Sequence, residues 1–215
     1  MGHILQANGS MEADACRARA SFMARVDDLR DNLFFANPQQ IVQGIQLYCC
    51  DGYGSMIWNL TSEYSEKYFR SWNIQVRNSW RVSNMTHTYL VENYFAKGQP
   101  SLRTQIYTRY GQFVNKLLNS PSKEIRFLCK ILINDPRSTI CKNIWNLNNI
   151  TNVNILSASK AEFRNAIKVD PIPENDKWRA GLLDVMLETR KFKTYSKLNL
   201  NKDQFDDMLE SLCIS

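Results

Sequence analysis

Two pairs of adjacent aspartates are the residues whose spacing comes closest to catalytic chemistry in this chain of 215 residues. Asp27 with Asp28, and Asp206 with Asp207, raise the question of a two-metal polymerase or nuclease, in which carboxylates from different elements converge on one point. Neighbouring side chains on a helix diverge by about 100°, which does not favour a shared metal ion. We therefore expect both pairs to be solvated helix surface.

The other side chains with catalytic potential are isolated in the sequence. His87 has no acid or cysteine close by, so we expect it to cap or pack a helix. The six cysteines contain no C-x-x-C pair, and two histidines are too few to complete a clustered four-ligand zinc site. Cys49 and Cys50 are adjacent and open to a metal or redox reading, but buried thiols on a helix fit better. Phosphate-cradling glycine loops, G-x-S-x-G and H-E-x-x-H are absent. We expect no catalytic residue, cofactor or metal.

Positive charge is concentrated in the middle of the chain. The formal net charge is +6, yet residues 67–142 hold 13 Lys or Arg against 3 acids, a balance of +10. From Asp170 onward there are 9 acids against 7 bases. Such a distribution is typical of a protein with an anionic partner. No apolar run of 18 residues and no secretory pattern occurs, so we expect no membrane span and no secretion.

Two predicted helices place these cations on one side. On the first helix, Lys67, Arg70, Arg77 and Arg81 fit an arc of roughly 80°. On the second, Lys123, Arg126 and Lys130 line one face, and Ile125, Leu128 and Leu132 line another. Lys and Arg at such positions neutralise phosphates, although they equally serve as the solubilising face of a bundle. The candidate nucleic-acid-binding residues are Lys67, Arg70, Arg77 and Arg81, followed by Lys123, Arg126 and Lys130.

Helical periodicity dominates the elements that must position these residues. Apolar residues recur at steps of three and four, and no sustained alternation predicts a strand. On the third helix the inward residues are Tyr64, Tyr68, Trp72, Val76 and Trp80. The sequence therefore predicts an all-α, multi-helix bundle. The expected helices cover 11–33, a segment from 38, 63–81, a segment from 101, a segment from 121 to 135, 177–191 and 202–212.

Local signals mark where these helices begin and end. Asn37 with Gln40, Ser159 with Glu162, and Asn201 with Gln204 have the spacing of capping boxes. After the stripe Ile41, Ile45, Tyr48 and Cys49, the stretch "DGYGSMIW" predicts a tight junction. There Gly52 is expected to end a helix in the left-handed conformation, and Gly54 to permit a turn or a close approach. The asparagine-rich residues 137–157 are predicted to be an irregular linker with at most one short helix, and "DPIPEND" to interrupt the chain.

The order of several motifs resembles the region that follows the polymerase core in reverse transcriptases of non-LTR, LINE-like retrotransposons. The resemblance covers nearly the whole chain and rests on order and spacing. It is carried by "GHIL", "MEADACRARASF", "LRDNLFFANPQQIVQGIQLYCCDGYGSMIW", "FRSWNIQVRNSWRVSNMTHTYL", "RYGQFVNKLLNSPSKEI", "DPRSTICKNI", "DKWRAGLLDVMLETR" and "LESLC".

The resemblance implies a polymerase thumb with a C-terminal helical extension. Gly2 and His3 match a primer-grip turn, with Met1 where leucine is usual. It further implies a primer-grip remnant at 1–10, a helical thumb-like domain at 11–136, the linker at 137–157 and a C-terminal helical region at 158–215. The family's metal-binding aspartates lie upstream of this turn, so we expect a non-catalytic fragment rather than an enzyme.

The partners that the resemblance implies are RNA, DNA or an RNA–DNA hybrid, together with a palm domain that the chain lacks. A nuclear or cytoplasmic location follows from the way such elements are copied. Two functions remain open: nonspecific nucleic-acid binding by the basic helix faces, and a helical protein-interaction module or inactive remnant of a transposon.

Overall fold

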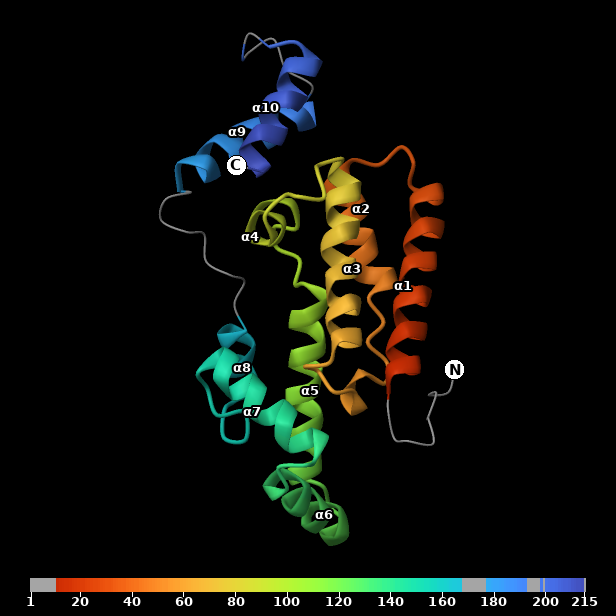
Figure 1. Ribbon diagram of the computed structural model, residues 1–215, viewed down its shortest axis with the longest axis vertical. Helices are drawn as coiled ribbons and strands as arrows, with labels where there is room; N and C mark the ends of the chain where they lie inside the picture. Colours follow the sequence, from red (N-terminus) through yellow and green to blue (C-terminus); the bar gives the residue numbers. More distant parts are fainter. Residues whose placement is uncertain (1–10, 168–176, 193–197, 199, 215) are drawn as a thin grey trace. The chain divides into compact units, whose positions relative to one another are not determined.

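The computed structural model describes residues 11–167, 177–192, 198 and 200–214, and these residues are all-α, without a strand (Figure 1). The predicted fold class is confirmed. In chain order the elements are α1 (Glu12–Asn32), α2 (Pro38–Gly44), the π-helix η1 (Ile45–Cys49), the 3₁₀-helix η2 (Ser55–Ile57), α3 (Glu63–Trp80), α4 (Thr88–Leu90), the π-helix η3 (Val91–Phe95), α5 (Leu102–Leu118), α6 (Lys123–Asn134), α7 (Thr139–Thr151), α8 (Lys160–Ala166), α9 (Lys177–Phe192) and α10 (Lys202–Ile214).

The chain divides into two compact units, and both contain segments that lie far apart in the sequence. The first unit comprises Met1–Ala24, Cys50–Ser71 and Leu102–Lys168, and the second Arg25–Cys49, Trp72–Ser101 and Val169–Ser215. Helices α1 and α3 therefore contribute their N-terminal parts to the first unit and their C-terminal parts to the second.

Trp58 lies at the centre of the first unit's core. Its ring meets Tyr68 edge to face at 5.4 Å between centroids, and its Nε1 donates to Oδ2 of the buried Asp14, 2.9 Å away. Its carbonyl accepts from Nδ2 of Asn143 at 2.8 Å, while Oδ1 of Asn143 accepts from the Leu60 amide at 3.0 Å. Burying these polar groups is tolerated because each is paired inside the core.

Of the two glycines of "DGYGSMIW", Gly54 lies in a turn as predicted, whereas Gly52 has a role other than the predicted one. Gly54 has the left-handed backbone, with φ of 85°, and begins η2. Gly52 is instead the site of close approach, since a Cβ there would lie 3.3 Å from Cγ1 of Ile106 and 2.5 Å from Nη1 of Arg109. The prediction is therefore wrong for Gly52, because the close approach involves α5, which lies about 50 residues further along the chain.

The prediction of an irregular linker at 137–157 is also wrong. A 13-residue helix, α7, occupies most of it, and the Ser138 hydroxyl caps this helix by accepting from the Ile140 amide at 3.1 Å. Asn143, Ile144 and Leu147 are buried on one face. The modest helix propensity of asparagine is outweighed here by burial of that face.

The second unit has its own aromatic core. Trp80 packs against Phe95 at 5.7 Å between ring centroids, and its Nε1 donates to the Phe95 carbonyl at 2.8 Å. Arg190 of α9 donates through Nη1 to the Trp80 carbonyl at 2.8 Å. Tyr48, predicted to face inward, is 72% exposed because the helix continues from Ile45 as a π-helix, which shifts the following residues around the axis.

The predicted helix starts are confirmed. The side chain and backbone of Asn37 pair reciprocally with Gln40, and those of Ser159 with Glu162. The Asn201 carbonyl Oδ1 and amide likewise pair with Gln204, at 2.8 and 3.0 Å. "DPIPEND" lies outside the described residues.

Candidate nucleic-acid interface

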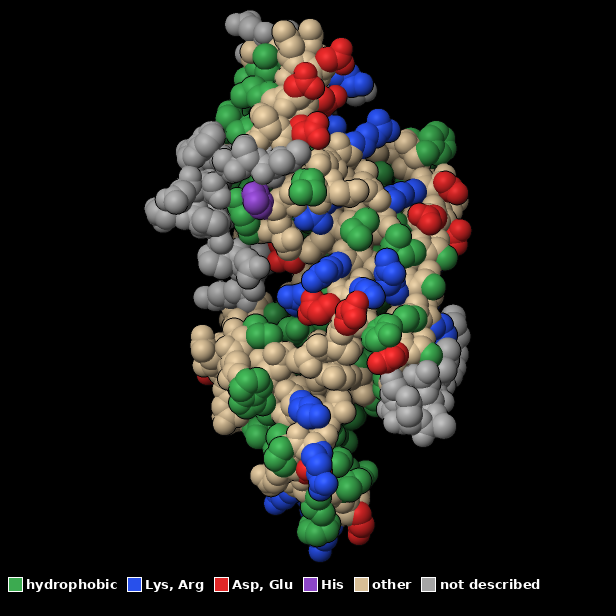
Figure 2. All heavy atoms as spheres, viewed as in Figure 1, with side chains coloured by type: hydrophobic (Ala, Val, Ile, Leu, Met, Phe, Trp, Pro, Cys, Tyr) green, Lys and Arg blue, Asp and Glu red, His purple; other side chains and the backbone are tan. Residues whose placement is uncertain are grey.

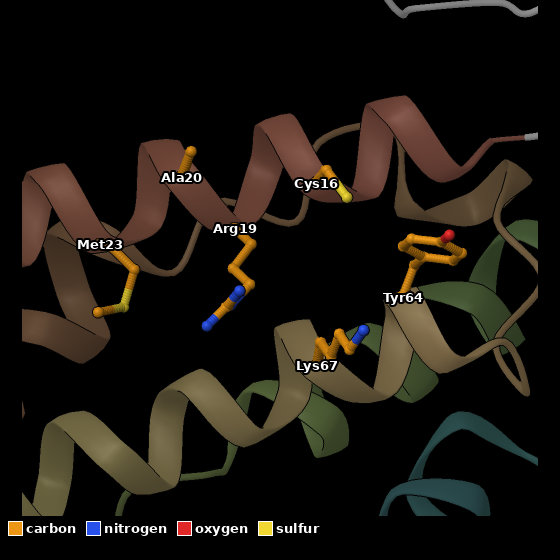
Figure 3. A pocket seen from close by; sticks show the side chains of 6 residues that line it. All are labelled: Cys16, Arg19, Ala20, Met23, Tyr64 and Lys67. Carbon is orange, nitrogen blue, oxygen red and sulfur yellow. The ribbon is translucent and has the colours of Figure 1, made fainter.

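A pocket of about 250 Å³ lies between α1 and α3 within the first unit. On α1, Cys16, Arg19, Ala20 and Met23 follow one another at steps of three, one and three residues, so they share one helical face. Tyr64 and Lys67 line the opposite wall from α3. Figure 3 shows the side chains of Arg19 and Lys67 extending from the two helices into the space between them.

Exposed cations border this groove. Nε of Arg19 donates to the Ser71 hydroxyl at 3.1 Å, which joins the two helices and leaves the guanidinium on the surface. The ammonium of Lys67 pairs with Glu63 at 2.7 Å, and this hydrogen bond raises the pKa of Lys67 and lowers that of Glu63. Arg70, three residues further along α3, is exposed. We call Arg19, Lys67 and Arg70 the groove cations.

The groove cations suit a phosphate backbone better than a reacting group. Because these side chains are exposed to water, an ion pair with a protein carboxylate stabilises each of them only slightly. On a polyanion, the same cations can replace condensed counterions. Negative charge on Glu12 raises the pKa of the Tyr64 hydroxyl, so this phenol stays protonated beside them at neutral pH.

The structure does not bring the four predicted cations of α3 onto one binding face. Arg77 is only 8% exposed, and its Nε donates to the Thr86 carbonyl at 3.1 Å. Burial lowers its pKa, and its role in the second unit is to hold the segment that follows α3. Arg81 is exposed but lies past the end of α3, in the left-handed conformation with φ of 53°. The prediction is wrong for Arg77, because one helical side meets different neighbours along its length.

On α6 two of the three predicted cations are exposed, and the third is engaged with the preceding loop. Lys123 and Lys130 are exposed. Arg126 is half-buried, and its Nη1 donates to the carbonyls of Ser120 and Pro121, so it holds the preceding loop. The apolar positions of α6 do not form a buried face: Ile125 and Leu128 are exposed and Leu132 is half-buried, whereas Cys129 is buried.

The other residues that the sequence suggested for chemistry are the two aspartate pairs and His87. Asp27 and Asp28 are exposed, and Asp206 pairs with Arg190 at 3.5 Å. His87 precedes α4 without a capping bond from its side chain and stacks on Tyr89 at 5.3 Å between ring centroids. Across the described part of the chain, no three His, Cys, Asp or Glu side chains gather as metal ligands.

The adjacent cysteines were the last candidates for a metal or redox site. Cys49 and Cys50 are both buried, as expected, and burial raises the pKa of the Cys49 thiol. Gly2 and His3, the proposed primer-grip residues, lie outside the described residues.

Arg19 is the groove residue that the sequence did not single out. Phe22 and Val26, four residues apart on α1, are buried. The sequence does place Cys16, Arg19, Ala20 and Met23 on one face of α1. Without the position of α3, however, that face cannot be distinguished from ordinary helix surface.

Searches of protein-family models, curated proteins and solved structures found no match to this chain. Among the described residues, none of the helices combines the length and apolar character needed to cross a bilayer.

Proposed function

We propose that this chain is the thumb-like and C-terminal helical part of a non-LTR retrotransposon reverse transcriptase, and that its role is to bind nucleic acid without catalysing a reaction. The observation that carries the binding role is the placement of the exposed groove cations along two neighbouring helices. The motif order and the all-α fold support the assignment to a thumb.

The groove would act on the sugar–phosphate backbone. Arg19 offers a planar guanidinium, and Lys67 and Arg70 add two cations from α3. None of these groups is arranged to read a base edge, so the expected binding is independent of sequence. Affinity should decrease as salt competes for the phosphates.

The test is titration of the purified chain into labelled RNA–DNA hybrid, single-stranded RNA and duplex DNA across a salt series. The variant R19Q/K67Q/R70Q removes the groove cations. A control, K97Q/K116Q/K202Q, removes three exposed lysines elsewhere and so changes the net charge equally. Circular dichroism checks that both variants remain folded.

We expect the groove variant to lower the slope of log affinity against log salt by about 2 to 3, since each phosphate contact contributes about 0.7 to 0.9. The control should change the slope much less. Equal losses in both variants would mean that net charge, not the groove, attracts the ligand. Absence of binding by the folded wild-type chain would refute the proposed function.

A second candidate, a protein-interaction module, is favoured by exposed hydrophobic side chains in the second unit. Phe34, Phe35, Leu47 and Tyr48 are each more than 70% exposed, which is unusual for large apolar groups. If this surface binds a second copy, sedimentation will show association that F34S/F35S abolishes. A monomer at all concentrations would contradict self-association.

A further inference from the structure

Helix α6 presents an aromatic ring between two cations on its solvent side. Phe127 is 68% exposed. Lys123 lies four residues before it and Lys130 three residues after it, so the three side chains project from within roughly 60° of one another around the helix. Phe127 and Lys130 also line a shallow hollow together with Ile131, Asn134 and Asp135.

Helix α7 presents a second exposed ring, with a cation on one side of it and a neutral amide on the other. Trp145 is 69% exposed, with the exposed Lys142 three residues before it and the exposed Asn149 four residues after it. Helices α6 and α7 pack against each other and are joined by only four residues, 135–138. Figure 2 shows blue and green side chains side by side at the α6 end of the molecule. We call Phe127 and Trp145, with Lys123, Lys130 and Lys142, the α6–α7 surface.

Exposed aromatic rings with cations one turn away match the chemistry of unpaired nucleotides. A base can stack on each ring while its phosphate meets a neighbouring ammonium, and this works for any base because every base has a π-face. A duplex hides its base faces, so the rings would gain nothing from it. Burial does not explain the rings either, because both are more than two-thirds exposed.

Two other partners fit this surface less well. A lipid surface requires an uninterrupted apolar face, but the exposed Glu124 lies on the helix between Ile131 and Leu128 and would have to enter the membrane. A protein partner would have to cover three exposed lysines, a residue type depleted from protein interfaces. The positive charge and the rings together favour a single-stranded polyanion.

We propose that the α6–α7 surface binds single-stranded nucleic acid by stacking bases on Phe127 and Trp145, separately from the backbone-binding groove. The proposal rests on the proposed function only in taking nucleic acid as the ligand. It adds a preference for unpaired strands and two aromatic residues that carry it.

The test is titration of the full chain with oligo(dT) and oligo(U) of 20 nucleotides and with a 20-base-pair duplex. The variant F127L/W145L keeps both positions apolar and removes the rings. A matched control, Y48L/Y53L, removes two exposed rings elsewhere in the chain. Tryptophan fluorescence gives a signal that the W145L variant assigns to Trp145: of the tryptophans whose side chains the structure describes, Trp58, Trp72 and Trp80 are buried whereas Trp145 is exposed.

We expect F127L/W145L to weaken single-strand binding at least tenfold and duplex binding less than twofold, with the control unchanged. Oligo(dT) should quench the wild-type fluorescence, and W145L should lose most of that quenching. K123Q/K130Q should lower the salt slope for single strands by about 1.5.

Several results would overturn the inference. If F127L/W145L binds single strands normally while the groove variant does not, the α6–α7 surface is not a binding site although the proposed function stands. If the wild-type chain binds no nucleic acid, both fail. If the two rings are instead required for binding anionic vesicles or for dimerisation, the surface serves a membrane or a second copy.

Discussion

At the scale of single residues, the amide side chain of Asn143 pairs with two buried backbone groups. It pairs with the carbonyl of Trp58 and the amide of Leu60 from the buried face of α7. Its replacement by leucine leaves both backbone groups buried without a partner. We expect N143L to lower the free energy of unfolding by about 2–4 kcal/mol in urea denaturation, since each lost buried partner costs about 1–3 kcal/mol.

Asn149 provides the control for this prediction. It lies on the same helix and is exposed, so N149L should change stability by less than about 0.5 kcal/mol. Equal losses in the two variants would mean that the buried amide of Asn143 does not determine the effect.

Tyr110 makes stability depend on pH in the alkaline range. Burial raises the pKa of its hydroxyl to about 12, while Asn143 opposes part of this shift by hydrogen bonding. Between pH 10 and 12 the unfolded chain releases this proton and the folded chain retains it. Stability should therefore fall with rising pH, by about 1.4 kcal/mol per unit from this group.

The variant Y110F removes the titrating hydroxyl, so the decline above pH 10 should become shallower. Burial also raises the pKa of Tyr107, which will keep part of the decline in place. Chemical denaturation at pH 9, 10 and 11 measures the slope. An unchanged slope in Y110F would show that other groups account for it.

At the scale of elements, the contact between α5 and α8 depends on Gly111. A Cβ at this position would lie 2.7 and 2.9 Å from two ring atoms of the buried Phe163. Alanine favours a helix by roughly 0.5–1 kcal/mol over glycine, but overpacking costs about 1–3 kcal/mol. We therefore expect G111A to be destabilising in thermal and urea unfolding.

A second substitution tests the cause. F163L makes room beside the new methyl group, so G111A should cost less in the F163L background than in the wild type. Equal costs in the two backgrounds would show that the ring is not what opposes the added methyl group.

Helix α6 shows why binding surfaces are recognised at the scale of elements. Its pattern of Ile125, Leu128 and Leu132 predicts a buried face, yet Ile125 and Leu128 are exposed and Cys129 is buried. Amphipathic periodicity says which residues share a side but not which side meets a neighbour. The α6–α7 surface is therefore visible only once α7 is placed.

At the scale of the whole molecule, the two proposed binding surfaces both belong to the first unit. The groove cations belong to α1 and α3, and the other surface to α6 and α7, with no residue in common. Losses of binding free energy at independent sites add.

We therefore expect R19Q/K67Q/R70Q combined with F127L/W145L to lose single-strand binding more severely than either set alone, while duplex binding matches that of the groove variant. Fluorescence anisotropy at fixed salt measures both ligands. If the combined variant binds single strands no more weakly than one of its parents, only one surface is in use.

The sequence by itself determined the all-α class and the starts of most of the helices, although not the presence of α7. These depend on contacts within about four residues: the capping pairs Asn37–Gln40 and Ser159–Glu162, and the periodicity that buries Tyr68, Trp72 and Val76. Only the tertiary structure decided that Arg77 is buried, that Asn143 belongs to the core, and that Arg19 shares a groove with Lys67. Whether a side of a helix is buried or exposed depends on which distant segment packs against it, and no local pattern contains that information.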